Sequence, residues 1–232
     1  MTGLKVVFEE VNVFSGLDSV QILRNVNFSI SNGEKICLMG LNGSGKTTVL
    51  STMAGLWKYD GKIEIGSLPL TIGNLKKIRE SIGYLFNVPE DQLLFTSVEE
   101  DVALSLMKKS MSEKEIHLKV SEILSLLGIS NLNAADIHEL SHGQKQKVAL
   151  AGAMICKPPL LCLDEPSSAL DPVSKRKLID MLSENNNSTI ICATNDIEFA
   201  DGFASRKILM ENGSVLSDDI STMELKKHWK LD

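Results

Sequence analysis

The hydrophobic residues in the first ninety positions form short alternations and runs, which is the pattern of β-strands. Apolar and polar residues alternate over 4–13 and again over 22–30, and the turn sequence Ser31-Asn32-Gly33 follows. The apolar run at 35–39 predicts a buried strand. We expect further short strands at 62–65, about 69–72 and 82–86, and one helix at 47–56.

The middle of the chain changes to helical periodicity. Apolar positions within 98–109 suit a helix only moderately. Ser112 with Glu115 forms a capping box before a second helix, which keeps one apolar face until a glycine ends it. Ser141 with Gln144 forms another capping box, and its helix is expected to run to about residue 156, before two prolines.

Strand patterns return in the last third of the chain, at 160–163 and 189–193. Between them Asp171 caps a helix whose first residue is Pro172. Asn212-Gly213 predicts a hairpin turn, and a short helical tail is expected from 220 to 232. Strands that alternate with helices predict an α/β fold with a mainly parallel sheet.

We expect one domain over residues 1–232. Its core covers about 1–87 and 158–232, and a helical subdomain is inserted over about 88–157. The short strands at 62–65 and 69–72 are expected to pair antiparallel.

Composition narrows the possible functions. Apolar residues make up 43% of the chain and charged residues 23%, as in a globular protein. The net charge of -6 argues against a general nucleic-acid binder, and no apolar run approaches the length of a membrane span. Any membrane role would therefore come through a partner. The cysteines show no metal-ligand spacing, and three of them are expected to be buried in strands, which fits a reducing cytoplasm.

A phosphate-binding motif follows the strand at 35–39. Its residues are Gly40, Leu41, Asn42, Gly43, Ser44, Gly45, Lys46, Thr47 and Thr48, which fit the spacing G-x-x-x-x-G-K-[ST]. The glycines let backbone N–H groups turn around phosphates, and the next helix offers its positive N-terminus. Lys46 adds charge near the β and γ groups, and the Thr47 hydroxyl can face Mg²⁺. The alternative is a glycine-rich strand–helix turn without a ligand. The motif predicts that the chain binds a nucleoside triphosphate.

Two carboxylates end the apolar strand at 159–163. Asp164 at this position can hold Mg²⁺, directly or through water, and Glu165 can polarise an attacking water. An ordinary strand end is the alternative interpretation. The phosphate motif earlier in the chain favours the catalytic one.

The sequence Leu140-Ser141-His142-Gly143-Gln144 opens a helix whose N-terminus is itself an anion site. Ser167-Ser168-Ala169-Leu170-Asp171 follows just after the carboxylates. This order of motifs resembles the ATP-binding-cassette ATPases over essentially the whole chain. The resemblance implies a P-loop NTPase core with an antiparallel β subdomain and an inserted helical subdomain.

The resemblance also implies ATP and Mg²⁺ as ligands and a second cassette as a partner. In that family two cassettes pack head to tail, and each ATP lies between one phosphate loop and the signature segment of the other subunit. By this resemblance Ser141, His142, Gly143 and Gln144 form that segment here, and Asp171 is expected to help couple the two sites. Phe14 is placed like the aromatic residue that stacks on adenine, although a core residue at a strand end is the alternative.

A narrower resemblance involves the sequences GYLFNVPEDQL (83–93) and TSVEEDV (96–102), together with LSHGQKQK (140–147). They look like the ATPases of energy-coupling-factor and cobalt-type importers, which commonly tolerate His at the signature's third position. This implies a transmembrane partner and a cytoplasmic location on the inner face of the cell membrane. The nearby acidic residues either meet basic helices of that partner or form a solvated helix face; they are Glu90, Asp91, Glu99, Glu100 and Asp101.

Two positions depart from the family pattern. Asn87 stands where the family has the Gln that reaches Mg²⁺, and Asn195 stands where it has the His that bonds the γ-phosphate. Asn is one methylene shorter than Gln, and it has no titratable proton near neutral pH. We therefore expect a site that binds ATP and hydrolyses it slowly, with Glu165 and Asn195 as its catalytic residues. A heterodimer with an intact partner cassette is one way to accommodate this.

Three functions are compatible with these residues. The first is the ATP-hydrolysing subunit of an importer for metal ions or vitamins. The second is a regulatory or structural cassette whose hydrolysis is incidental. The third is a soluble cassette without membrane partners. The cassette does not touch the transported substrate, so its sequence does not identify that substrate.

Overall fold

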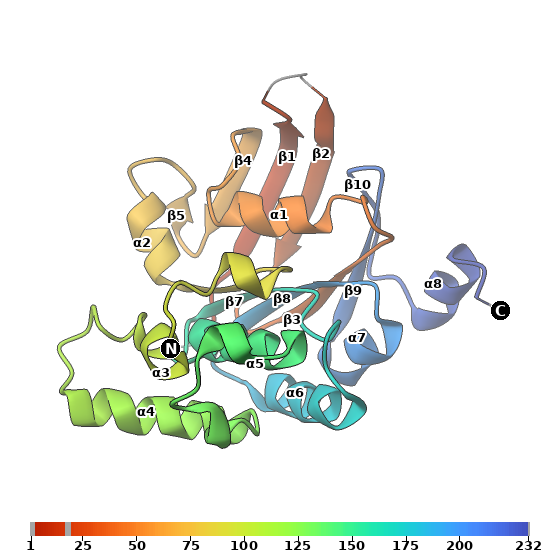
Figure 1. Ribbon diagram of the computed structural model, residues 1–232. Helices are drawn as coiled ribbons and strands as arrows, with labels where there is room; N and C mark the ends of the chain where they lie inside the picture. The colour runs from red at the N-terminus through yellow and green to blue at the C-terminus, as the bar shows by residue number, and fades with distance from the viewer. Residues whose placement is uncertain (1–2, 17–19, 232) are drawn as a thin grey trace.

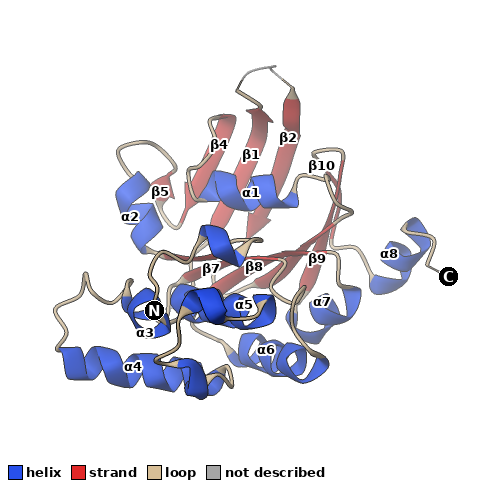
Figure 2. Cartoon of the chain, in the orientation of Figure 1, coloured by secondary structure: helices blue, strands red, loops and turns tan. Residues whose placement is uncertain are grey.

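The computed structural model describes residues 3–16 and 20–231, which form two β-sheets with helices on both faces of the larger one (Figure 1, Figure 2). The larger sheet has the strand order β10-β9-β3-β8-β7-β6. Neighbouring strands from β9 to β6 are parallel, and only β10 runs antiparallel to β9. The bounds are β3 Lys35–Met39, β6 Ile82–Leu85, β7 Leu160–Asp164, β8 Thr189–Thr194, β9 Arg206–Glu211 and β10 Ser214–Asp218.

The smaller sheet is antiparallel, with the order β2-β1-β4-β5. Its strands are β1 Val6–Phe14, β2 Gln21–Ile30, β4 Tyr59–Ile65 and β5 Leu68–Pro69. The rings of Phe8 and Phe28 stack across β1 and β2 with centroids 4.6 Å apart. This pair joins the apolar core between the two sheets.

Successive residues of β3 point into two different apolar cores. Ile36 and Leu38 pack with the smaller sheet and the first helix, whereas Cys37 and Met39 pack with the helices on the opposite face. The parallel sheet is thus buried on both faces, which explains why its strands read as continuous apolar runs.

The helices are divided between these faces (Figure 1). Helix α1 lies between the two sheets, and α3 to α7 gather against the other face of the larger sheet. The elements between β6 and β7 are all helices or 3-10 turns. The bounds are α1 Lys46–Met53, α2 Leu75–Glu80, α3 Val98–Ala103, α4 Glu113–Leu126, α5 His142–Met154, α6 Pro172–Glu184, α7 Ile197–Phe203 and α8 Thr222–His228, with 3-10 turns η1 Pro89–Asp91, η2 Ser130–Leu132 and η3 Ile137–Glu139.

The structure confirms the α/β class, the mainly parallel sheet and both predicted capping boxes. Asp171 caps α6 by accepting from the N–H of Ser174, with Pro172 as the first helical residue. All four cysteines are free, and three of them are buried, as expected. A third capping box, Ser221 with Glu224, opens α8.

Four local predictions were wrong or incomplete. Helix α3 ends at Ala103 rather than near 109, because the chain continues in tight turns in which Leu106 N–H bonds the Ala103 carbonyl. The strand expected near 69–72 ends at Pro69, since a turn follows and leaves Ile72 95% exposed. The short helices α2 and α7 carried too little periodicity to be predicted.

The predicted Asn212-Gly213 turn is present, and it contacts the phosphate-binding motif. Both residues have positive φ, at 49° and 80°, as a two-residue hairpin between β9 and β10 requires. The Gly213 N–H donates to the carbonyl of Ser44 at 3.0 Å, and its own carbonyl accepts from Arg24 N–H at 2.8 Å. The hairpin therefore joins β2 to the phosphate-binding loop.

Replacing Gly213 with Ala is expected to destabilise the protein strongly. A Cβ at this position would lie 2.0 Å from the backbone oxygen of Ile22, and left-handed backbone adds about 1–2 kcal/mol for a non-glycine residue. Gly33→Ala is the matched control, because Gly33 also has positive φ, at 75°, and its Cβ would meet nothing within 4 Å. Urea unfolding should show a clearly larger loss for Gly213→Ala. Equal losses would show that the close approach is unimportant.

Candidate functional site

The phosphate-binding motif forms the loop between β3 and α1, and it lines a cavity of about 310 Å³. Gly43 and Gly45 have φ of 82° and 105°, a backbone that side chains rarely adopt. Open space surrounds the position of a Cβ on Gly43, so the loop leaves room for a ligand there. The cavity is lined by Ile22, Asn42, Gly43, Ser44, Gly45, Lys46, Thr47, Thr48, Asn87 and Glu165.

Lys46 places a positive charge in this cavity. Its side chain is only 6% exposed, and Nζ donates to the carbonyls of Gly40 at 2.7 Å and Leu41 at 3.3 Å. Burial lowers the pKa of Lys46, while the charges of Glu165 and Asp164 oppose that shift. A phosphate entering the cavity would meet this ammonium together with the N-terminus of α1.

Asp164 ends β7 and is nearly fully buried, at 1% exposed. Burial raises its pKa to about 6, against the hydrogen bond of Thr47 and the charge of Lys46. Its Oδ1 has no hydrogen-bond partner among the residues that the structure describes. An orphaned carboxylate oxygen beside a threonine hydroxyl is a donor set that suits Mg²⁺, which usually takes one or two protein ligands plus phosphate and water. Within residues 3–16 and 20–231 no cluster of three His, Cys, Asp or Glu side chains could hold a metal.

Glu165 follows directly and has an unusual backbone. Its φ is 45°, in the left-handed region, and its N–H donates to Ala193 on β8 at 2.8 Å. The carboxylate accepts from the hydroxyl of Thr194 at 3.1 Å and lies 4.0 Å from Nζ of Lys46. Burial raises the pKa of Glu165, and Lys46 opposes that rise. A carboxylate with this pKa shift beside a phosphate cavity can accept a proton from water.

The two departures from the family pattern lie in different cavities. Asn87 is exposed and lines the phosphate cavity. Asn195 lines a neighbouring cavity of about 430 Å³ between α6 and α7, which also includes Glu165. Only Glu165 is common to both.

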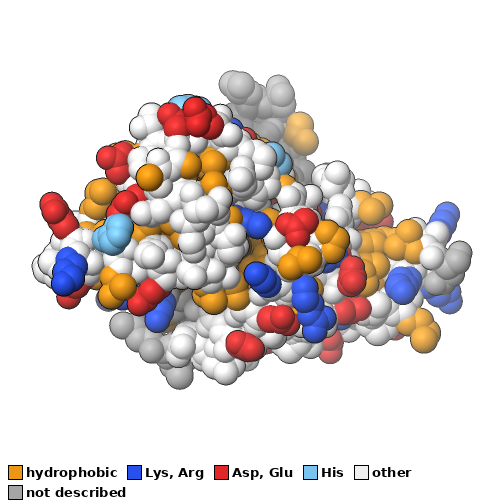
Figure 3. Space-filling model, turned by 60° about the horizontal axis from the view of Figure 1, so that its bottom comes forward, with side chains coloured by type: hydrophobic (Ala, Val, Ile, Leu, Met, Phe, Trp, Pro, Cys, Tyr) orange, Lys and Arg blue, Asp and Glu red, His pale blue; other side chains and the backbone are white. Residues whose placement is uncertain are grey.

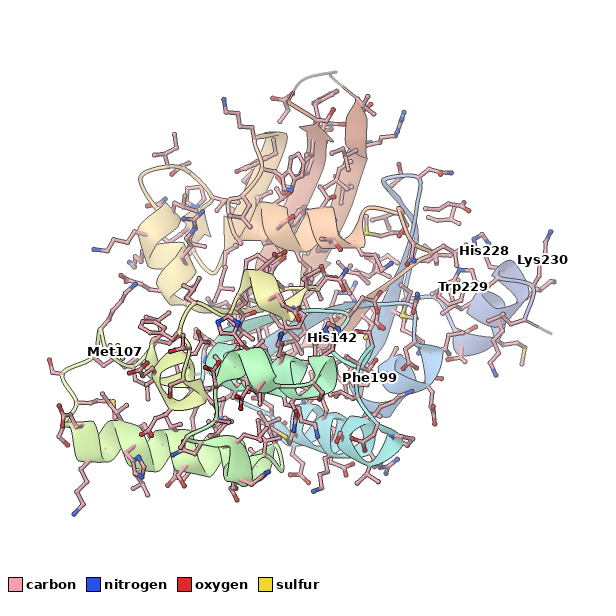
Figure 4. The ribbon with its side chains drawn as sticks, in the orientation of Figure 1. Met107, His142, Phe199, His228, Trp229 and Lys230 are labelled. Carbon is pink, nitrogen blue, oxygen red and sulfur yellow. The ribbon has the colours of Figure 1, made fainter. Side chains whose placement is uncertain are left out.

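The signature segment forms the first turn of α5 (Figure 4 labels His142). Ser141 Oγ accepts from the N–H of Gln144, and the Gln144 side chain accepts from the N–H of Ser141. A Cβ on Gly143 would lie 2.6 Å from the carbonyl of Ala169, so this turn packs against the loop after the carboxylates. None of Ser141, His142, Gly143 and Gln144 lines the phosphate cavity of the same chain.

Asp171 and Phe14 also lie outside the lining of that cavity. Asp171 is exposed, and hydrogen bonds from Ser174 lower its pKa to about 2. Its Oδ2 is 3.8 Å from Nζ of Lys147 on α5. Phe14 ends β1 and is 42% exposed.

The acidic residues near η1 do not form one solvated face. Asp101 is buried and accepts from the N–H groups of Leu94 and Phe95, so it is unavailable to a partner. Glu99 lies 2.6 Å from His117, and Glu90 lies 3.4 Å from Lys145. The expectation of a common role for all five carboxylates is therefore wrong for Asp101, because its carboxylate is used to accept the backbone N–H groups of Leu94 and Phe95.

Sequence reasoning missed two residues of the site. Ile22 contributes to the cavity although it reads as an ordinary strand residue. Thr194 bonds Glu165 across β7 and β8, which pair in parallel register. The contact between Thr194 and Glu165 becomes evident only once the strand order is known.

Comparison with known proteins gives a consistent result. The model of the family described as ABC transporter matches residues 23–168. A protein of Methanospirillum hungatei named energy-coupling factor transporter ATP-binding protein EcfA2 is 38% identical over 200 residues, which cover 84% of this chain and 50% of that protein. EcfA of Methanocaldococcus jannaschii is 32% identical over 206 residues, 87% of this chain and 74% of that protein. The chain thus spans about half the length of the first of these relatives.

Two solved structures have the same fold. The ATP-binding cassette MJ0796, described as a dimer in a post-hydrolysis state with ADP and Pi, has a TM-score of 0.85 at 30% identity and covers 92% of this chain and 97% of its own. The structure of cbiO1 from Clostridium perfringens, described as part of the ABC transporter complex cbiONQ, has a TM-score of 0.79 at 32% identity, covering 97% and 90%. No helix in the described ranges is long and apolar enough to cross a bilayer.

Proposed function

The chain belongs to the ABC transporter family, and from that premise we propose that it is the ATP-binding and ATP-hydrolysing subunit of an energy-coupling-factor type importer. One observation carries the proposal: Lys46 and Glu165 line the cavity formed by the phosphate-binding loop at the start of α1, and the charge of Asp164 also acts on Lys46. The names of the relatives support the narrower assignment to energy-coupling-factor transporters.

Thr47, which lines the phosphate cavity, and Asp164, whose carboxylate contacts the Thr47 hydroxyl, are the residues that would hold Mg²⁺. Asn87 also lines that cavity. Bound there, Mg²⁺ would neutralise charge on the phosphate oxygens. The backbone of Gly43 and Gly45 and the ammonium of Lys46 position the triphosphate. Glu165 accepts a proton as the oxygen of water attacks the γ-phosphorus and the bond to the β-phosphate oxygen breaks.

A second cassette completes the site in this proposal. The signature residues Ser141 to Gln144 present an N-terminal helix turn to solvent and do not line the phosphate cavity of their own chain. The dimeric state described for MJ0796 supports a head-to-tail pair. Both a homodimer and a heterodimer satisfy this geometry.

A transmembrane subunit is the second partner, which places the protein on the cytoplasmic inner face of the cell membrane. Val88, Leu94 and Phe95 are exposed hydrophobic residues next to η1, and they offer an apolar contact there. Acidic, basic and hydrophobic side chains are interspersed over the face in Figure 3, so charge alone does not select a docking surface on that face. The cargo would be a metal ion or a vitamin.

Native co-purification tests this assignment. We expect the tagged chain to bring down a multi-span membrane protein and a second cassette, and the complex to hydrolyse ATP. Recovery of a fully active soluble dimer without any membrane protein would favour a cassette outside transport.

Asn87 and Asn195 favour a second candidate, a regulatory cassette of a heterodimer with little hydrolysis of its own. Asn195 is exposed beside the second cavity and brings no imidazole to the reaction. The turnover per site separates this candidate from the first.

Replacing Asn195 with His is expected to raise ATP turnover on the order of tenfold. One well-placed hydrogen-bond donor at the transition state often changes the rate by more than this. Asn32→His, on an exposed turn before β3, is the control and should leave turnover unchanged. The measurement is steady-state phosphate release. Turnover by the unchanged chain on the order of 10 s⁻¹ would contradict the slow-site hypothesis.

A further inference from the structure

Thr194 has a fixed hydroxyl at the end of β8. The residue is fully buried, and its Oγ1 accepts from the N–H of Asp196 at 3.0 Å. The hydroxyl donates to Oε2 of Glu165 at 3.1 Å. Because the oxygen already receives an N–H, the hydroxyl hydrogen is directed at the carboxylate.

This bond distinguishes the two carboxylate oxygens of Glu165. Oε2 accepts from the hydroxyl of Thr194 on β8. Oε1 lies on the side of Lys46, 4.0 Å from Nζ. Glu165 also lines the phosphate cavity, so the bond from Thr194 to Oε2 leaves Oε1 as the oxygen nearer to Lys46 in that cavity.

The segment that carries Thr194 is itself anchored by Asp196. The Asp196 carboxylate lies 2.7 Å from Nζ of Lys175 on α6 and accepts from the Ser167 hydroxyl at 3.2 Å. It also caps α7 through the N–H of Phe199 at 3.0 Å. Two helices and the loop after Glu165 therefore hold this segment in place.

The side chain of Asn195 does not help to orient the Glu165 carboxylate. It is exposed, and within residues 3–16 and 20–231 no hydrogen bond of its amide group is found. The hydrogen bond that orients the carboxylate from this end of β8 thus comes from the Thr194 hydroxyl.

We propose that Thr194 is a positioning residue that orients the Glu165 carboxylate for proton transfer from the attacking water. This inference rests on the proposed ATP hydrolysis. It adds that, in a site with Asn at position 195, the rate depends on the hydroxyl of Thr194.

The test is a pair of substitutions at this position. Thr194→Val keeps the shape and removes the hydroxyl, and it should lower kcat by about 10- to 100-fold with little change in KM for ATP, as expected for loss of a hydrogen bond to a charged group. Thr194→Ser restores a hydroxyl and should recover most of the rate. Thr189→Val is the matched control, because Thr189 is a buried threonine on the same strand whose hydroxyl accepts from Gly33. It should leave kcat unchanged.

A crystal structure of the Thr194→Val protein gives a readout that needs no turnover. We expect the Glu165 carboxylate to leave its position between β8 and Lys46. An unmoved carboxylate, an unchanged kcat, or a Ser variant as slow as the Val variant would each overturn the inference. Failure of the proposed function looks different: the unchanged complex would then show no ATP hydrolysis sensitive to Glu165→Gln.

Discussion

Glu165→Gln is expected to lower ATP turnover by about 100- to 10,000-fold, the usual contribution of a general base, while ATP affinity stays nearly unchanged. The amide keeps the shape of the side chain and removes the group that accepts the proton. The Thr194 hydroxyl can still donate to the amide oxygen, so the local structure should persist.

Two measurements check this result, single-turnover hydrolysis and titration with a fluorescent ATP analogue. Glu64→Gln, at a surface position on β4 where Glu64 pairs with Lys62, is the control and should turn over normally. Retention of more than about a tenth of the rate in Glu165→Gln would assign proton transfer to another group.

Lys46→Met should weaken ATP binding by about 10- to 100-fold, the equivalent of losing hydrogen bonds to a charged group. Met has a similar length and suits a position that is 6% exposed. The substitution removes the ammonium that bonds Gly40 and Leu41 and lies near Glu165. Unlike Glu165→Gln, it acts on binding.

Calorimetric titration with ATP measures this change. Lys35→Met is the control, because Lys35 lies at the opposite end of β3, where it donates to the Ser183 carbonyl and burial lowers its pKa. Its ATP affinity should match that of the unchanged protein. If Lys46→Met binds ATP equally well, the cavity is not a triphosphate site.

The phosphate-binding loop and the helix caps could be predicted because each depends on residues close together in the sequence. Ser141 and Gln144 are three positions apart, and the capping box they predicted is present. The motif at 40–48 likewise contains its own turn and helix start.

The contacts of Glu165 could not be predicted, since they depend on strand order. Thr194 reaches the carboxylate only because β8 lies next to β7 in the sheet. The burial of a side chain could not be predicted either. Asp101 lies in an acidic segment like its neighbours, yet its carboxylate accepts from the backbone N–H groups of Leu94 and Phe95. The signature segment was recognised from its resemblance, and one chain alone does not place it against nucleotide.

The hydrogen bond from Gly213 to Ser44 has a consequence for synthesis of the protein. Ser44 leaves the ribosome about 170 residues before Gly213, which at 5–20 residues per second is a delay of roughly 10–30 s. During that interval the nascent loop lacks the hairpin that fastens it to β2. Competence to hold nucleotide should therefore arise late, once the final strands have been translated.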